Sequence, residues 1–505
     1  MKKRWYNYRP ILLIFIFLVL GSLFAFYVNK HTVISIISLS VIFILVLSIA
    51  ILKKKIKYLI IPCLAFIIAF GAYNITTYNF NKSVEYSPNV ITSRIYSVSS
   101  VKQGCIIVKG DSCEFDSEKI KTNLNILIYD NSSLFVGIEI GSVIKFTPTN
   151  VYKTNLNYND IPNSKVVHEN LKYTATVNIE NLEVEKFDLT FAERIKNKIK
   201  ESFDGKLNNE NAELAYSALF GDKDFLSENQ QSAYRLSGIA HLLAVSGLHV
   251  SIIVGVIIAV LSIFRVKNEW VKIILIAAFL LMYAYICNFS ISVVRASIMS
   301  LISLFAVKFG REYDSLTALG FAGVVVFCLY PLCVFDIGFL MSFGCAIGII
   351  LFNKPIKLVL IKMKIPNKLA DSISLTISTL LALLIINAVF FKNLNVISLI
   401  ANVIIIPVFA FAFSVVFIVS FVSLLMPFTN VLLVPLNYVF DLINVVATVL
   451  GNLSFANIPT ATLNFILIFI YFVLIFSISR ICLATRWNKA IISLLLLAIF
   501  VVLLV

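Results

Sequence analysis

The segment from His241 to Val250, HLLAVSGLHV, holds two of the chain's four histidines, with a serine and a glycine between them. A serine near a histidine is the minimum set for a nucleophile and its general base, so Ser246 could act with His241 or His249 in an intramembrane hydrolase. In one continuous helix the two histidines would lie about 80° apart around the axis and could not share a ligand. Gly247 would tolerate a break, and broken helices occur at membrane depth where they line a cavity or are buried in protein. A hydrolase, a permeation path and close packing are therefore all open.

Other charged groups lie in or beside apolar segments, where their cost makes each one a functional candidate. Arg295, in SISVVRASIMS, is the clearest, although a side chain near a span end can also reach the interface. Asp336 opens the segment DIGFLMSFGCAIGI, where a carboxylate could simply cap a helix. Asp222 and Asp224 precede HLLAVSGLHV and would need further oxygen ligands to hold a divalent cation. Solvation and capping are the simpler interpretations of these acids.

Cys105 and Cys113 lie in the polar part of the chain, whereas the other six cysteines lie in or beside apolar segments. They flank an expected hairpin, and a compartment outside the cytoplasm can be oxidising. A disulfide between them and two free thiols are both open. No Cys/His cluster has the spacing of a zinc site, so we expect no metal and no cofactor.

The composition is that of an integral membrane protein. Of 505 residues, 59% are hydrophobic and only 14% charged, and the mean hydropathy is +0.93. A soluble domain is closer to half apolar and a quarter charged. The net charge of +15 comes from the short loops between apolar segments, which indicates membrane topology rather than nucleic-acid binding.

Apolar segments and basic loops predict the topology. Basic residues at Lys2 to Arg9 and at Lys53 to Lys57 place the N-terminus in the cytoplasm and residues from about 80 to 235 outside it. We expect three spans within 1–79 and about 9–11 helices within 236–505. The predicted spans are 11–28, 33–52, 58–77, 238–263, 271–288, 291–308, 315–330, 335–352, 373–391, 395–425 (as one or two pieces around Pro407), 432–451, 461–479 and 488–505.

Two smaller regions lie between these spans. Short β-branched runs between turn residues in 80–188 predict a small extracytoplasmic β-barrel, with an OB-fold as one candidate. In 189–235, the segment FAERIKNKIKESF spaces apolar residues by four, which predicts an amphipathic helix suited to the membrane surface.

A longer stretch around the two histidines, ALFGDKDFLSENQQSAYRLSGIAHLLAVSGLHVS, resembles the signature segment of the ComEC family of bacterial competence membrane proteins. The segments SISVVRASIMSLISLF, YPLCVFDIGFLMSFGCAIGI and NVISLIANVIIIPVFAF resemble the blocks that follow it in that family, in the same order. The resemblance implies a polytopic α-helical membrane protein with an extracytoplasmic OB-like β domain inserted after the third span. It covers nearly the whole chain.

The resemblance also implies a function: a channel in the cytoplasmic membrane that admits one strand of transforming DNA during natural competence. The implied partners are single-stranded DNA, the lipid bilayer and other competence proteins, namely a DNA receptor, a cytoplasmic translocation ATPase and a separate nuclease; homo-oligomer formation is open. The positions that match the family motif and would form its conduit are Gly221, Asp222, His241, Ser246, Gly247, His249, Arg295, Asp336, Phe339 and Ser342.

One departure from the family pattern concerns the nuclease. Many longer members end in a metallo-β-lactamase-like domain with an HxHxDH motif, whereas this chain has four histidines and ends in an apolar segment. We therefore expect a short form without that domain and without enzyme activity. The region 80–188 has several tyrosines but no surplus of positive charge, so DNA binding there would be weak and salt-sensitive. A transporter of a small or lipid-linked solute and the Ser246 hydrolase are the alternatives.

Overall fold

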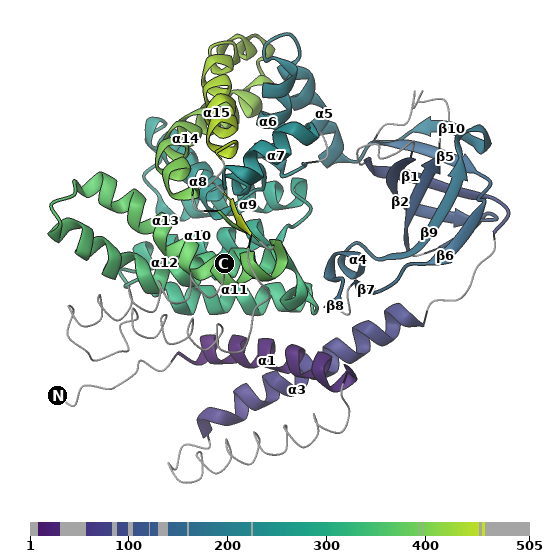
Figure 1. The fold of residues 1–505 in the computed structure, drawn as a ribbon, viewed down its shortest axis with the longest axis horizontal. Coiled ribbons are helices and arrows are strands. Elements are labelled where there is room, and N and C mark those ends of the chain that lie inside the picture. Colours follow the sequence, from purple (N-terminus) through teal and green to yellow (C-terminus); the bar gives the residue numbers. More distant parts are fainter. Residues whose placement is uncertain are drawn as a thin grey trace. The chain divides into compact units, whose positions relative to one another are not determined.

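The computed structural model describes residues 9–30, 57–82, 88–98, 105–120, 122–129, 140–158, 161–223, 226–391, 393–395, 397–453 and 457–459 (Figure 1). The predicted spans 33–52, 461–479 and 488–505 lie outside these residues, as do Asp224 and the basic residues before Arg9. The chain divides into two compact units. Unit 1 comprises Met1–Asn197 and Glu312–Ile337, and unit 2 comprises Lys198–Arg311 and Gly338–Val505.

Three apolar helices belong to unit 1: α1 (Pro10–Lys30), α3 (Lys57–Asn81) and α11 (Ser315–Leu329). Small residues allow them to approach closely, as is usual between helices in membranes. A Cβ at Gly21 would lie 2.5 Å from the Phe66 carbonyl oxygen of α3, and one at Gly323 of α11 would lie 2.3 Å from the Phe15 ring of α1. Arg9 joins α1 to the start of α11 through an ion pair of 2.6 Å with Asp314.

The rest of unit 1 is a small mixed sheet. Its strands pair in the order β10-β5-β1-β2-β4-β9-β6, with β3 beside β2; β4 and β9 are parallel and the other neighbours antiparallel (Figure 1). Alternate side chains such as Ile95, Val108 and Ile126 fill one buried core. The strands are β1 (Ile91–Val98), β2 (Cys105–Phe115), β3 (Glu118–Lys119), β4 (Asn123–Tyr129), β5 (Ser142–Phe146), β6 (Asn150–Lys153), β9 (Leu171–Asn178) and β10 (Leu182–Phe187).

The small β domain is thus present, but the predicted OB-like barrel is not confirmed. Among the described residues, strand pairing runs from β10 to β6 without a pair that joins these two ends, so the sheet is not closed. A separate pair, β7 (Asn157–Tyr158) and β8 (Ile161–Pro162), precedes the one-turn helix α4 (Ser164–His168). The insertion of the domain after a third span depends on residues 33–52, which the structure does not describe.

Cys105 and Cys113 are both free thiols on the same strand, β2, rather than on the two sides of a hairpin. Eight residues of extended chain separate them by roughly 26 Å, whereas a disulfide needs Cα atoms about 4–7 Å apart. The disulfide considered from the sequence is therefore not formed, and the alternative of two free thiols is the one observed.

Unit 2 is helical. It begins within α5 (Phe191–Phe203) and continues through α6 (Asn209–Phe220), α7 (Glu228–Leu236), the 3-10 turn η2 (Ala240–Leu243), α8 (Gly247–Ile263), α9 (Glu269–Ile286) and α10 (Ile291–Lys308). Its second part contains α12 (Ile337–Lys362), α13 (Asn367–Ile386), a π-helical turn (Asn387–Phe391), α14 (Ser398–Ser423), the 3-10 helix η5 (Pro427–Leu433) and α15 (Leu436–Gly451). The short strands β11 (Asn393–Asn395) and β12 (Asn457–Pro459) pair with each other.

Six helices of the described part of the chain are long and apolar enough to cross a membrane: α1, α3, α9, α10, α12 and α14. The bent pair of η5 and α15 could supply one more, and α8 and α11 are shorter apolar helices. The predicted span 238–263 was too long, because the helix begins only at Gly247. The span 395–425 forms one helix through Pro407, as a membrane helix can when its freed carbonyl finds another donor.

The segment predicted to lie on the membrane surface does form the helix α5, but much of its apolar side is buried in protein. Ile199 and Phe203 are completely buried, and α6 is buried along most of its length. This apolar face is therefore not available to a lipid surface, although Phe191 at the start of α5 is exposed.

Candidate functional site

The HLLAVSGLHV segment contains a break and then a capped helix start. Residues 240–243 form the 3-10 turn η2, Ala244 and Ser246 are extended, and α8 begins at Gly247. Ser246 is the N-cap, and its Oγ accepts a hydrogen bond from the Leu248 amide at 3.2 Å. The Ser246 amide donates to Nδ1 of His249 at 3.1 Å, which completes a capping box. The sequence therefore breaks the helix here because serine and histidine satisfy amides that a continuous helix would have bonded.

The capping box also fixes the protonation of His249. Because Nδ1 accepts a hydrogen bond from a backbone amide, the proton of the neutral ring lies on Nε2. The side chain is completely buried, with the rings of Phe409 and Phe413 in edge contact at centroid distances of 5.4 and 4.5 Å. Among the described residues Nε2 has no hydrogen-bond partner. His249 thus presents a buried N–H donor that faces away from the cap.

Arg295 lies on α10 and is only 9% exposed, so the side chain does not extend to an exposed interface. Its guanidinium packs against the first residue of α8: a Cβ at Gly247 would lie 2.9 Å from Nη2 of Arg295. Glycine at position 247 therefore makes room for the arginine, in addition to beginning the helix. The structure brings together Ser246, Gly247, His249 and Arg295, four of the residues singled out from the sequence.

Two further motif residues lie on α12. Phe339 is buried and stacks on Phe343 with a centroid distance of 4.4 Å. Ser342 is 9% exposed, and its buried Oγ has no hydrogen-bond partner within the described residues. Cys345, one turn further along α12, lies within electrostatic reach of Arg295. This face of α12 is therefore close to the arginine of α10.

The helices before the break hold it in place. Gly221 ends α6 in a left-handed conformation (φ 79°), and its amide donates to the Ser217 carbonyl at 2.7 Å. The Ser217 hydroxyl donates to the carbonyl of Leu243 at 3.1 Å, and the Tyr283 hydroxyl of α9 donates to the carbonyl of Leu219 at 2.6 Å. Asp222 follows Gly221 and is partly buried. Gly221 thus acts through the backbone of α6.

His241 lies within electrostatic reach of His249, whereas Asp336 belongs to the other unit of the chain. His241 lies on the turn η2 and is exposed, whereas His249 is buried, so the two imidazoles have different environments. Asp336 belongs to unit 1, where it accepts a hydrogen bond from the Ser164 hydroxyl of α4 at 3.1 Å. Near it, the rings of His168 and Tyr330 meet edge to face at 4.0 Å. Asp336 therefore contacts the β domain.

A polar network on α15 was missed by the sequence analysis. Asn211 of α6 donates to Asp441 at 2.7 Å and accepts from Asn444 at 3.1 Å, and the Tyr234 hydroxyl donates to Asn444 at 2.8 Å. Asn437 accepts from Asn211 at 3.2 Å and donates to the Lys206 carbonyl at 2.8 Å. The spacing of residues 437, 441 and 444 places all three on one face of an otherwise apolar helix. This polar spacing is the sequence pattern from which the network could have been predicted.

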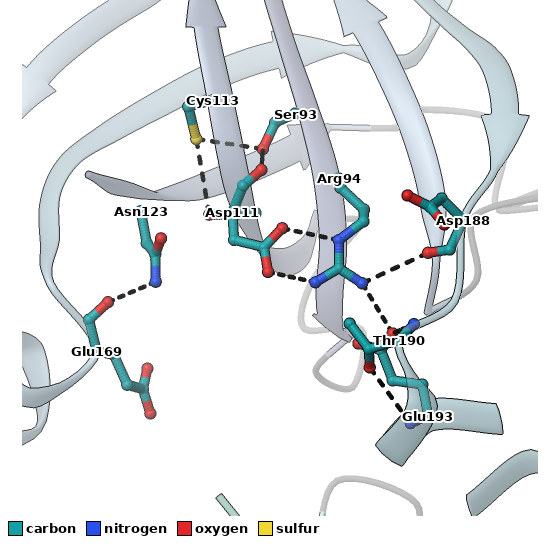
Figure 2. A network of polar contacts seen from close by, with 10 residues as sticks. Ser93, Arg94, Asp111, Cys113, Asn123, Glu169, Asp188, Thr190 and Glu193 are labelled. Carbon is teal, nitrogen blue, oxygen red and sulfur yellow. Dashed lines mark hydrogen bonds and ion pairs between the residues drawn. The ribbon is translucent and has the colours of Figure 1, made fainter. Parts of the chain in front are cut away.

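A second polar network, in unit 1, joins the sheet to the start of α5 (Figure 2). Arg94 of β1 forms ion pairs with Asp111 of β2 and, at 2.8 Å, with Glu193 of α5. Glu193 also accepts from the Thr190 amide at 2.7 Å. Burial alone would lower the pKa of Arg94, but the hydrogen bonds and charges of its two carboxylate partners outweigh burial and raise that pKa. The arginine therefore stays charged and fixes α5 to the β domain.

The Ser246 cluster supplies hydrogen-bonding groups and one positive charge. The Oγ atom of Ser246 lies 2.8 Å from Nδ1 of His249, a distance typical of a nucleophile and its base. The same two side chains, however, are occupied as a helix cap, and the four helices that carry the cluster, α8, α10, α12 and α14, contain no carboxylate to orient the imidazole. Within the described residues, no group of three His, Cys, Asp or Glu side chains could hold a metal ion.

Comparisons with known proteins show which family the sequence resembles. The family model described as Competence protein matches residues 218–485, which include the break, α8 to α15 and the α15 side of the asparagine network. The ComE operon protein 3 of Bacillus subtilis (strain 168) is 23% identical over 387 residues, 73% of this chain and 47% of that protein. Recombination protein 2 of Haemophilus influenzae is 30% identical over 146 residues, 27% of this chain and 18% of that protein. No solved structure matches.

The matched parts of these relatives are less than half of their lengths. The similarity therefore extends over most of this chain but not over most of either relative.

Proposed function

The chain belongs to the competence protein family, and from this membership we propose that it is a multi-pass channel of the cytoplasmic membrane that admits single-stranded transforming DNA during natural competence. The observation that carries the proposal is the match of residues 218–485 to the family. That stretch contains the cluster of Ser246, Gly247, His249 and Arg295, of which His249 and Arg295 are buried. A span that only crosses lipid has no use for a broken start, a buried imidazole and a buried guanidinium.

Part of the β domain is also suited to an unpaired strand. Tyr129 at the end of β4 and Tyr152 on β6 are 45% and 48% exposed, and they are close enough for their hydroxyl groups to interact electrostatically. Aromatic rings bind the bases of single strands by stacking, without sequence preference. On the proposed topology this domain lies outside the cytoplasm and guides a strand towards the membrane helices. A DNA receptor, a cytoplasmic translocation ATPase and a nuclease are the proposed partner proteins.

The alternatives are less well supported. A hydrolase would need Ser246 free to react, whereas its Oγ is held in the cap of α8. Nothing observed in the described helices favours a small or lipid-linked solute over a nucleic-acid strand, and the family match favours the strand.

The direct test is uptake of labelled DNA by a strain that lacks the gene. We expect transformation to be lost, and to return when the full-length chain is supplied. His249→Ala and Arg295→Ala should then lower transfer into the cytoplasm while DNA still binds to the cell surface. Arg265→Ala is a matched control, because Arg265 is an exposed arginine just beyond the other end of α8. Transformation at the wild-type level in the deletion strain would refute the proposed function.

A further inference from the structure

The first turn of α9 and the last turn of α10 form an exposed aromatic surface. The Trp270 ring is 44% exposed and meets the rings of Phe305 and Phe309 edge to face, at centroid distances of 6.2 and 5.9 Å. Phe309 is itself exposed. Both helices are long and apolar enough to cross a membrane. An exposed tryptophan at the end of such a helix is typical of the boundary between hydrocarbon and water.

Basic side chains accompany these rings. Nζ of Lys308, the last residue of α10, lies 5.7 Å from the centroid of the Trp270 ring, which is close enough for a cation–π contact. Arg311 is exposed in the turn that follows. Neither has an ion-pair partner among the described residues, whereas Lys272 on the first turn of α9 pairs with Glu269 at 2.8 Å. The surface therefore carries a net positive charge, which favours an anionic ligand.

An apolar face of α9 leads away from this surface. Ile274 and Leu281 are 62% and 65% exposed. With 3.6 residues per turn, both lie within about 40° of Trp270 around the helix axis, so the three side chains share one face. The helix rises about 16 Å from Trp270 to Leu281, which is close to half of a hydrocarbon core of about 30 Å. The exposed face is therefore as long as one leaflet, with its positive charge at the end where headgroups lie.

We propose that Trp270, Lys308 and Arg311 bind the headgroup of an anionic phospholipid, whose acyl chains lie along the exposed face of α9. The headgroup phosphate accepts hydrogen bonds from the ammonium and guanidinium groups. A nucleic-acid strand also carries phosphates, but it has no use for an apolar face of this length, so the observations favour the lipid. A lipid held here would fix the depth and rotation of α9 and α10 in the membrane. The site goes beyond the proposed function, because it concerns the bilayer around the protein rather than the strand.

The test uses the full-length protein in detergent and follows, by native mass spectrometry, how much phosphatidylglycerol it retains as the lipid is added. The wild type should bind phosphatidylglycerol more tightly than zwitterionic phosphatidylcholine. Lys308→Gln should weaken the tightest phosphatidylglycerol site about fivefold, the usual contribution of one basic residue near an anionic membrane surface. Trp270→Leu keeps an apolar side chain but loses the cation–π contact, so it should weaken the same site about threefold.

Lys362→Gln is the matched control. Lys362 is the exposed last residue of α12, as Lys308 is of α10, but no aromatic ring within the described residues makes a cation–π contact with it. The substitution removes the same charge from another basic helix end and should leave the tightest site unchanged. Equal weakening in Lys308→Gln and Lys362→Gln would mean that the lipid responds only to the overall charge of the loops, and would overturn the site.

A competition measurement decides between a lipid and a nucleic-acid strand. An oligothymidylate should not displace phosphatidylglycerol from the wild type. Displacement that is lost in Lys308→Gln would assign the surface to a strand and overturn the lipid site. Phosphatidylglycerol should also raise the melting temperature of the wild type more than that of Lys308→Gln. Variants that bind the lipid as the wild type does would overturn the site and leave the proposed function, which uptake by the deletion strain tests, in place.

Discussion

Ser246 and His249 lie as close together as a nucleophile and its base, and their shared role as a helix cap makes a distinct prediction. A serine-directed fluorophosphonate should not label the protein, because Oγ is held by the Leu248 amide and His249. Ser246→Ala should lower the free energy of unfolding by about 1 kcal/mol through loss of the cap, and Ser246→Asp should restore most of it. Gel fluorescence and thermal unfolding measure the two effects. Labelling that disappears in Ser246→Ala would instead indicate a hydrolase.

Cys113 offers a second prediction at the level of a single side chain, with a defined pH dependence. Burial raises the pKa of its thiol to about 11, so the thiolate is scarce at pH 8. Iodoacetamide should therefore leave Cys113 unmodified in the folded protein and modify both Cys105 and Cys113 after denaturation without reductant. Mass spectrometry of the peptides reports this. Thiols that react only after reduction would show that they had been bridged.

The same raised pKa affects stability in a known direction. The folded state keeps the proton at pH values where the unfolded thiol, with an ordinary pKa of about 8.5, has lost it. The stabilisation from this group is therefore complete below pH 8.5 and is lost as the pH rises towards 11. Unfolding of the β domain by urea at pH 8 and pH 10 measures the difference, and greater stability at pH 10 would contradict it.

The residue types of the site were predictable from the sequence, but their roles were not. Costly groups in apolar segments pointed to His249 and Arg295, both of which are buried in unit 2. The side chain that Gly247 accommodates comes from a helix that starts more than forty residues later, and no local pattern reveals such a partner. His241 looked equivalent to His249 in spacing, yet the break before α8 leaves it exposed on a separate turn.

At the scale of elements, the junction between β1 and α5 depends on Glu193. Its carboxylate is 13% exposed, pairs with Arg94, and accepts the Thr190 amide at the start of α5. Removing one partner of a buried ion pair leaves the other charge without compensation, at a cost of about 3–5 kcal/mol. We expect Glu193→Gln to destabilise the β domain by an amount near the lower end of this range, because Asp111 still pairs with Arg94.

Hydrogen exchange of residues 188–196, followed by mass spectrometry, would detect the loosened start of α5. Glu201→Gln is the matched control, since Glu201 is exposed on the same helix, and it should leave exchange unchanged. Equal protection in Glu193→Gln and the wild type would show that the ion pair does not hold the junction.

The asparagine network makes a prediction about the support of the broken segment. Asn211 is completely buried and bonded to Asn437, Asp441 and Asn444 of α15. Asn211→Leu should leave these polar groups of α15 without their hydrogen-bond partner and lower the free energy of unfolding by about 1–3 kcal/mol. Amide hydrogen exchange in α6 and α7 should become faster. Asn209→Leu, at an exposed position of the same helix, should have little effect. An unchanged melting temperature for Asn211→Leu would mean that water replaces the lost bonds.

Elements with strong periodicity were predictable, and those defined by long-range packing were not. The predicted span 291–308 coincides with α10, because the length of the apolar segment sets the bounds of this helix. The predicted start at residue 238 was wrong because the break depends on the cap at Ser246. The apolar stripe of α5 was recognised correctly, but periodicity does not tell whether lipid or protein will cover it. Closure of the β sheet likewise depends on pairing between distant strands.

For the whole molecule, the sequence predicted a multi-pass membrane protein from hydropathy, and the six described helices able to span a membrane, together with the family match, agree. The division into two units could not be predicted from the sequence. Glu312–Ile337 lies late in the chain but belongs to the same unit as Met1–Asn197. Its helix α11 meets α1 through Gly320 and Gly323, a contact between residues some three hundred positions apart. Hydropathy identifies each helix without indicating its neighbours.

The orientation of the molecule is the prediction on which the proposed direction of transport depends. The basic loops predict that the β domain lies outside the cytoplasm and the loop after α12 inside it. Lys119→Cys on β3 and Met363→Cys after α12 are suitable reporters, because both side chains are exposed. In intact cells a membrane-impermeant maleimide should label Lys119→Cys above the level of the parent protein. Met363→Cys should be labelled only after the membrane is permeabilised. The reverse pattern would place the tyrosines of the β domain in the cytoplasm, where they could receive a strand that leaves the membrane helices but could not guide one towards them.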